Sequence, residues 1–232
     1  MKISKLINFL RNRYAPRGAK LSFSQAGEDL IMSYALSILG ISNPTYIDIG
    51  GHHPVFGNNT YLFYHQNGRG IVVEPIESLC QLIRNKRPED TCVPAGAGKS
   101  DGQASFYNFP QNTRSTFSSV QAVLWSKQSG QKASVSQIPI YSLDTLIERY
   151  LNNRCPDLVS IDAEGYDFQI LSGFSFKYRP KFFCVETLAN TEQDQLPTRN
   201  TDIYALFKKN NYHSYAETPA NTIFADSKVL LK

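Results

Sequence analysis

Residues 45–59 read TYIDIGGHHPVFGNN, and this stretch decides the fold of the 232-residue chain. Its first five residues are largely β-branched or aromatic, as in a strand, and they run directly into Gly50 and Gly51. Glycines after a strand let backbone N–H groups approach a ligand, because no Cβ stands in the way. The stretch predicts a strand that enters a ligand-binding turn, with a purely structural turn as the alternative.

A second strand, Gly70 to Val73, ends on the acidic residue Glu74. The spacing between Gly50 and Glu74 is typical of a carboxylate that accepts hydrogen bonds from a ribose diol. The glycines do not follow the GxGxxG pattern, so no cradle for a pyrophosphate is present. We therefore expect the ligand to be a nucleoside without phosphates.

The composition fits one cytoplasmic α/β domain, since 41% of the residues are hydrophobic and no apolar run approaches the roughly 20 residues of a membrane span. The cysteines form no CxxC pair, which favours buried reduced thiols over a zinc site or a disulfide framework. They are Cys80, Cys92, Cys155 and Cys184.

The net charge of +4 comes from the N-terminus. Residues 1–20 hold six basic and no acidic side chains, so the rest of the chain has 24 − 6 = 18 basic against 20 acidic residues. This balance argues against a nucleic-acid partner. Residues 3–13 place apolar side chains at helical spacing among the basic ones, which predicts a basic amphipathic arm. This segment either binds weakly to the inner face of a membrane or is a solvated segment packed on the domain or on another subunit.

Strand and helix patterns alternate along the chain, which predicts an α/β fold with a mostly parallel sheet and helices on both faces. Ligands of such sheets bind beyond the carboxyl ends of the strands, where Asp48, Gly50, Glu74 and Gly96 lie. A turn at 218–220 predicts a C-terminal antiparallel hairpin. Helices are expected at 22–39, where Ser24 is the N-cap, and at 58–66, 76–86, 142–151 and 202–209.

Residues 96–100 read GAGKS, which resembles part of a phosphate-binding loop. The full pattern needs a glycine at position 93, where Val93 stands, and a helix after the loop, where a strand pattern follows. A small-residue loop beside an adenine ring is the favoured interpretation, and a nucleoside-phosphate site that uses Lys99 and Ser100 is the alternative. The polar segment 110–137 is expected to be a substrate loop or lid, or else a mobile loop.

Three carboxylates, Asp162, Glu164 and Asp167, follow a buried strand at 158–161, and Glu186 ends the next strand. Such a cluster is costly unless it is solvated, hydrogen-bonded or bound to a cation. It could supply a general base, an acceptor for a substrate hydroxyl or a hard metal ligand. The structural alternative is that Asp162 and Glu164 cap a helix.

Several runs, in this order and spacing, resemble the FkbM-type methyltransferases, which depend on S-adenosylmethionine. They are SQAGEDL (24–30), YIDIGGHHP (46–54), NNTYLFY (58–64), GIVVEP (70–75), TF (116–117), LVSIDAEGYD (158–167) and YRPKFFCVE (178–186). No single run is diagnostic, but the ordered set covers most of residues 22–187.

The resemblance implies a Rossmann-like class I methyltransferase fold, in which residues 21–232 form one domain around a seven-stranded, mostly parallel sheet. It also implies how the cofactor S-adenosylmethionine is held. Asp48, Gly50 and Gly51 would hold its methionine part, Glu74 its ribose and the loop around Ala97 its adenine. Family members methylate hydroxyl oxygens, often on sugars, so a glycan or another polyhydroxyl metabolite is the expected acceptor.

Methyl transfer to a hydroxyl requires in-line placement and a group that removes the proton. His53 and Asp162 are the candidates for this base, and Glu164 or Glu186 would orient the sugar. A histidine in such a loop could equally be an ordinary surface residue. A divalent ion such as Mg²⁺ between Asp162 and Glu186 would suit the carboxylates but is not required by their spacing. The chain could also be an inactive scaffold of the same fold, and it could form an oligomer.

Overall fold

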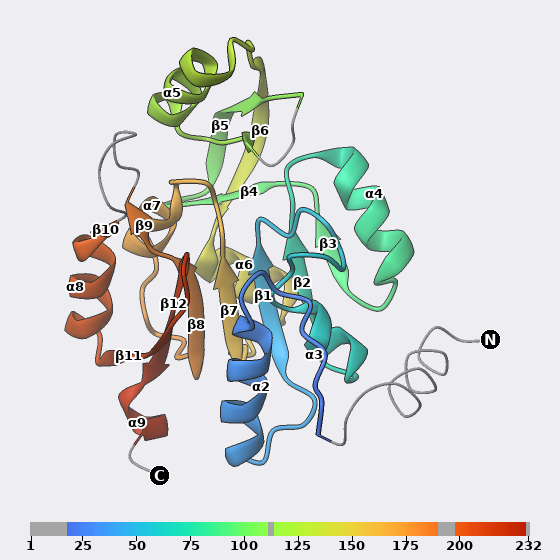
Figure 1. Cartoon of the computed structure of the whole chain (residues 1–232), viewed down its shortest axis with the longest axis vertical. Coiled ribbons are helices and arrows are strands. Elements are labelled where there is room, and N and C mark those ends of the chain that lie inside the picture. The colour runs from blue at the N-terminus through green and yellow to red at the C-terminus, as the bar shows by residue number, and fades with distance from the viewer. Residues whose placement is uncertain (1–17, 111–113, 190–197, 231–232) are drawn as a thin grey trace.

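The computed structural model describes residues 18–110, 114–189 and 198–230, so most of the predicted basic arm at 1–20 lies outside the described residues. A sheet of seven strands stands between two layers of helices (Figure 1). The strand order is β11-β12-β8-β7-β1-β2-β3. The strands are β1 (Thr45–Ile49), β2 (Arg69–Val73), β3 (Thr91–Val93), β7 (Leu158–Ile161), β8 (Phe182–Glu186), β11 (Tyr212–Glu217) and β12 (Asn221–Asp226).

Strands β3, β2, β1, β7 and β8 pair in parallel, whereas β12 is antiparallel to both β8 and β11. The predicted fold class, including the C-terminal antiparallel hairpin, is therefore confirmed. Parallel strands need crossover connections, and the helices that make them cover both faces of the sheet.

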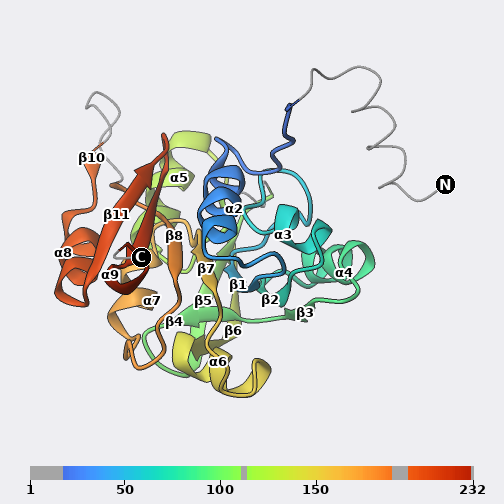
Figure 2. The ribbon, with the colours of Figure 1, turned by 90° about the horizontal axis from the view of Figure 1, so that it is seen from below.

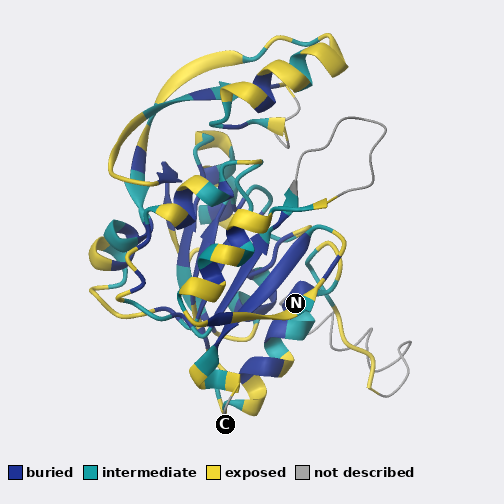
Figure 3. Cartoon of the chain, turned by 90° about the vertical axis from the view of Figure 1, so that its left-hand side faces the viewer, coloured by how far each residue is buried: buried dark blue, intermediate teal, exposed yellow. Residues whose placement is uncertain are grey.

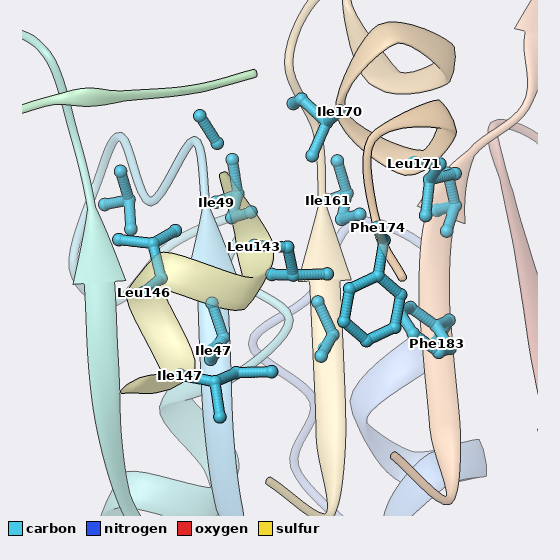
Figure 4. Packing of buried hydrophobic residues seen from close by; sticks show 14 of the residues in the cluster. Ile47, Ile49, Leu143, Leu146, Ile147, Ile161, Ile170, Leu171, Phe174 and Phe183 are labelled. Carbon is cyan, nitrogen blue, oxygen red and sulfur yellow. The ribbon is translucent and has the colours of Figure 1, made fainter. Parts of the chain in front are cut away.

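One face of the sheet carries α6 (Leu143–Tyr150), α7 (Asp167–Ser172) and α8 (Thr201–Lys209). Their apolar side chains pack on alternate strand residues such as Ile47 and Ile49 (Figure 4). The other face carries α2 (Glu28–Ile38), α3 (Tyr61–His65) and α4 (Glu77–Lys86), as Figure 2 shows. Because side chains alternate along β1, Tyr46 packs on this second face.

Helix α2 begins later than the sequence predicted, and Ser24 is not its N-cap. The N-cap is Gly27, with no side-chain cap, and the Ser24 hydroxyl donates to Asp29 (2.9 Å). The buried Glu28 carboxylate accepts hydrogen bonds from Thr218 Oγ1 (2.6 Å) and Asn221 Nδ2 (3.0 Å). Burial raises the pKa of Glu28, but these hydrogen bonds outweigh it and hold the pKa below its ordinary value.

A second, three-stranded sheet has the order β4-β6-β5, formed by β4 (Gly96–Gly98), β5 (Gly102–Asn108) and β6 (Ser134–Ser142). The prediction of a loop at GAGKS was thus wrong for residues 96–98, which pair in parallel with β6. Helix α5 (Ser119–Ser129) lies between β5 and β6. From here on, the arm means residues 102–110 and 114–142, and not the predicted basic segment at 1–20. It projects beyond the main sheet (Figures 1 and 3). Its predicted role as a substrate loop or lid stays a prediction.

The remaining elements are small. Strands β9 (Leu188–Ala189) and β10 (Thr198–Arg199) form an antiparallel pair, and α9 (Ser227–Leu230) follows β12. All four cysteines are free, and Cys155 is the exposed one. Among the described residues, no helix combines the length and apolar character needed to cross a bilayer.

Candidate active site

A cavity of about 450 Å³ lies at the carboxyl ends of β1, β2 and β7. This is within the range of about 300–1,000 Å³ that is usual for small-molecule sites. Loops after these strands form one wall, and the arm contributes Phe106, Ser115, Thr116 and Phe117 to another. The cavity therefore lies at the edge where parallel strands end, which is where the sequence predicted a ligand site.

The Gly50–Gly51 turn brings the backbone close to both neighbouring strands. Gly50 has φ +80°, and a Cβ there would overlap the carbonyl oxygen of Asp162. A Cβ on Gly51 would overlap Val72 Cγ1. Both glycines line the cavity, so their lack of a side chain serves the packing of the turn as well as access to a ligand.

Glu74 also lines the cavity, and each of its carboxylate oxygens accepts one backbone hydrogen bond. Oε2 accepts from His52 N (3.0 Å) and Oε1 from Ile76 N (2.8 Å). Burial, with a smaller contribution from the Asp48 charge, raises the pKa of Glu74 to about 7. Each oxygen keeps a second lone pair, so the fixed carboxylate can accept two hydroxyl donors, as a ribose diol would provide.

Asp48 does not line this cavity, although the resemblance placed it against the methionine part of the cofactor. Its side chain is on the α4 face of the sheet, where Oδ2 accepts from Asn58 Nδ2 (3.0 Å) and Thr60 Oγ1 (2.7 Å). The guanidinium of the fully buried Arg87 lies 3.7 Å away. Because Asn58 Nδ2 also donates to Gly51 O (3.1 Å), Asp48 and its partners support the turn from below. Direct contact with a cofactor stays a prediction.

Asp162 and Glu164 line the cavity, and no salt bridge joins either of them to a cation among the described residues. Burial, then the charges of Asp48 and Glu28, raise the pKa of Asp162 to about 6. Burial, then Asp162 and Asp167, raise the pKa of Glu164 to about 8. Glu164 also has φ +52°, a conformation that costs energy outside glycine and clusters at functional sites.

The capping alternative for Asp162 and Glu164 is not what the structure shows. Asp167 instead accepts from the backbone N–H groups of Ala163 (3.0 Å) and Gly165 (3.2 Å), and its pKa is raised to about 7, chiefly by burial. Asp167 therefore shapes the loop and leaves the other two carboxylates for a ligand.

Glu186, the fourth carboxylate, ends β8 and does not line the cavity. Burial, then the charges of Asp162, Asp167 and Glu164, raise its pKa to about 9. Within residues 18–110, 114–189 and 198–230, no group of three or more His, Cys, Asp or Glu side chains is arranged to hold a metal ion.

His53 lines the cavity, but its hydrogen bonds do not favour the role of a base. Nδ1 accepts from Val55 N (3.1 Å) and Phe56 N (2.9 Å). In the neutral ring the proton is therefore on Nε2, so His53 presents a donor, and its basic nitrogen is already engaged. This arrangement suits a residue that hydrogen-bonds an acceptor oxygen.

The apolar residues Ala97 and Phe117 both line the arm side of the cavity, and we call this part of its wall the apolar slot. Phe117 packs on Phe106 at 4.7 Å between ring centroids, and a Cβ on Gly96 would overlap the Phe117 ring. Such a slot fits a flat base. Lys99 and Ser100 are exposed outside the cavity, and no helix follows them, so the structure gives no support to a phosphate site there.

Sequence reasoning missed several cavity residues. Thr116 Oγ1 donates to the carbonyl oxygen of Glu164 (3.0 Å) and so connects the arm to the loop after β7. Phe56 also lines the cavity, and no local pattern indicated its place. Gln25 lines it too, as its position near the start of the first predicted helix and within the resembling run at 24–30 allows. The TF pair at 116–117 was likewise part of the resemblance.

The topology of the sheet and the cavity at its carboxyl edge are those of the Rossmann-like class I methyltransferase fold. The model of the family "Methyltransferase FkbM domain" matches residues 48–214, which is well over half of the chain. The chain belongs to this family, as the resemblance implied.

Solved structures with a similar trace include a TehB-like SAM-dependent methyltransferase from Corynebacterium glutamicum (9% identity, 96% of this chain and 97% of that chain, TM-score 0.43). An O-methyltransferase from Bacillus cereus in complex with SAH has 12% identity, with coverage of 96% and 88% and a TM-score of 0.43. TehB from Haemophilus influenzae has 8% identity, with coverage of 94% and 66% and a TM-score of 0.46. At these sequence identities and TM-scores, the structural similarities support no statement about function. No curated protein matches the chain.

Proposed function

We propose that the protein is an S-adenosylmethionine-dependent O-methyltransferase that acts on a hydroxyl of a sugar or a related polyhydroxyl metabolite. Family membership supports methyl transfer. The observation that carries the rest is that one cavity holds the backbone-fixed Glu74 carboxylate together with the carboxylates of Asp162 and Glu164. The first suits a ribose diol, and the others suit a hydroxyl that must lose its proton.

The residues present fit this cofactor. Glu74 would accept hydrogen bonds from the ribose hydroxyls, the slot at Ala97 and Phe117 would hold the adenine, and the Gly50–Gly51 turn would face the methionine part. Bound there, S-adenosylmethionine supplies a sulfonium methyl group, whose C–S bond breaks as the C–O bond to the acceptor forms.

Asp162 is the favoured base for the hydroxyl proton. With a pKa of about 6 it is mostly ionised near neutral pH, yet it is more basic than an ordinary aspartate. Glu164, with a pKa of about 8, is mostly protonated there and can donate to a hydroxyl oxygen. Nε2–H of His53 can do the same. These groups together would orient a polyhydroxyl acceptor.

Calorimetry tests the cofactor assignment. We expect micromolar binding of S-adenosylhomocysteine and no heat with ATP. The reverse pattern would contradict the proposal and support a nucleoside-phosphate protein. Methyl-labelled cofactor, offered with a panel of glycans and polyols in EDTA and in Mg²⁺, then tests transfer and any need for a metal. Cofactor binding without transfer to any acceptor extract would indicate an inactive scaffold.

A further inference from the structure

The arm presents an outer surface that the proposed reaction does not use. It lies beyond the carboxyl edge of the main sheet, and Figure 3 shows its outer parts as exposed, whereas the strands of the main sheet are buried. The same arm contributes Ser115, Thr116 and Phe117 to the cavity wall. A surface that docks against the arm therefore lies next to the candidate active site.

Helix α5 exposes a stripe of apolar side chains, which we call the α5 face: Val120 (68% exposed), Val123 (54%) and Leu124 (41%). Their i, i+3, i+4 spacing places them on one side of the helix, while Gln121 and Ala122 are buried on the other. Contiguous exposed apolar side chains bordered by polar residues mark a candidate interaction surface.

The segment of chain that carries the α5 face holds charges of one sign. Residues 102–143 contain no Asp or Glu, but they include Arg114, Lys127 and Lys132. Lys127 follows Val123 and Leu124 at i+4 and i+3, so it borders the apolar stripe. A long side chain in this position can bury its methylenes and keep its ammonium in a layer of phosphates.

We propose that the α5 face docks on an anionic lipid bilayer, with its apolar side chains in the interface and Lys127 and Lys132 at the headgroup phosphates. A symmetric contact with a second copy fits less well, because an acid-free arm would meet itself and bring lysines together without carboxylates to pair them. Docking in this way would bring the cavity to the membrane surface, within reach of a membrane-bound acceptor.

Vesicle sedimentation of the full chain tests the proposal. We expect retention on vesicles of phosphatidylcholine with phosphatidylglycerol, and little on phosphatidylcholine alone. Replacing Val120, Val123 and Leu124 together by Ser should weaken retention by about tenfold or more. Lys127→Gln and Lys132→Gln should each cost about fivefold at low salt and less at high salt.

The matched control is Tyr34→Ser with Ile38→Ser, because these α2 side chains are as exposed (58% and 66%) but lie away from the arm. This variant should keep its retention. Circular dichroism melts of all variants show that they are folded.

Three results would overturn the proposal. One is that the protein is retained equally on both kinds of vesicle, or is retained on neither kind. Another is retention that survives the triple Ser variant and disappears when residues 1–20 are deleted, which would assign it to the predicted N-terminal arm. The third is a dimer in light scattering that the triple variant dissociates, which would make the α5 face a self-association surface.

Discussion

Two groups of carboxylates, one buried and one half-buried, lie along the strands on either side of the Gly50–Gly51 turn, and the protein compensates their charges differently. Asp48 and Asp90 meet the buried Arg87, which lies 2.8 Å from Asp90 and also donates to Thr60 (2.9 Å). Asp162 and Glu164 form no salt bridge within the described residues. Their pKa values are raised to about 6 and about 8, although the charge of Arg114 partly offsets the rise at Glu164. The paired group supports the turn, and the unpaired group lines the cavity.

This difference separates carboxylates that hold the fold from carboxylates that are available for chemistry. A buried charge with a partner is stable only while the partner stays. Burial raises the pKa of Asp48 as well, in spite of the Arg87 charge, but Asp48 is engaged by Asn58 and Thr60 and lies outside the cavity. Asp162 and Glu164 line the cavity with raised pKa values and so a stronger affinity for a proton, which is what a general base needs near neutral pH. The four predictions below break or sharpen this comparison.

Asp162→Asn should have the largest effect. Asn keeps the shape of the side chain but cannot accept the hydroxyl proton, so methyl transfer should fall by about 10²–10⁴-fold. The affinity for S-adenosylhomocysteine should stay within a few-fold. Labelled-methyl transfer and calorimetry measure the two effects, with Asp144→Asn, outside the cavity, as the control. A variant that transfers at the normal rate would remove Asp162 from the role of base.

Arg87→Met should destabilise the fold by about 3–5 kcal/mol, because it leaves Asp48 and Asp90 buried without their cation. Urea unfolding of the unliganded protein measures this. Arg84→Met on the same helix removes an exposed pair with Glu77 and should cost at most about 1 kcal/mol. Equal losses for the two arginines would show that the buried network contributes no more than a surface pair.

Glu74→Ala should weaken S-adenosylhomocysteine binding by about 1–3 kcal/mol, since the ligand would lose charge-assisted hydrogen bonds in a buried site. Calorimetry at neutral pH measures the loss. Glu77→Ala, an exposed neighbour, should bind normally. An unchanged affinity for Glu74→Ala would show that the ribose lies elsewhere.

Glu186→Gln should change how stability depends on pH. The pKa of Glu186 is about 9 in the folded chain against an ordinary value of 4.5, so its contribution to stability is complete below about pH 4.5 and is lost as the pH rises through about 9. Between pH 5 and pH 9, the free energy of unfolding of the Gln variant should rise by at least about 1 kcal/mol relative to that of the native protein. Urea unfolding at both values, with the exposed Glu148→Gln as control, measures this. Parallel curves for variant and native protein would contradict it.

The sequence predicted the parallel sheet and the edge at which the cavity lies, because periodicity and glycine positions are local signals. Glu74 and Asp162 line the cavity for the same reason, since each directly follows a buried strand. Helix α5 was not predicted, because it buries Gln121 and exposes valines, the reverse of the usual pattern.

Other features depend on contacts between distant segments. Asp90, three residues after Arg87, is a local partner, but nothing in the sequence indicates that the guanidinium is fully buried, because the partners Asp48 and Thr60 come from another strand and loop. His53 is a local case: its hydrogen bonds are to amides of its own turn, and they depend on a backbone conformation that the sequence of the turn does not reveal.

The bond between Glu28 and Thr218 has a consequence for how the protein is made, because it joins residues 190 positions apart. While the chain is being synthesised, the start of α2 must wait for the last hairpin before its carboxylate finds these donors. A nascent or truncated chain that stops before residue 218 would have to leave that acid in water or bury it with fewer donors. Formation of the β11–β12 hairpin is thus needed before the Glu28 carboxylate finds these two donors, and we expect ribosome-bound fragments that lack the hairpin to be more sensitive to protease at the start of α2.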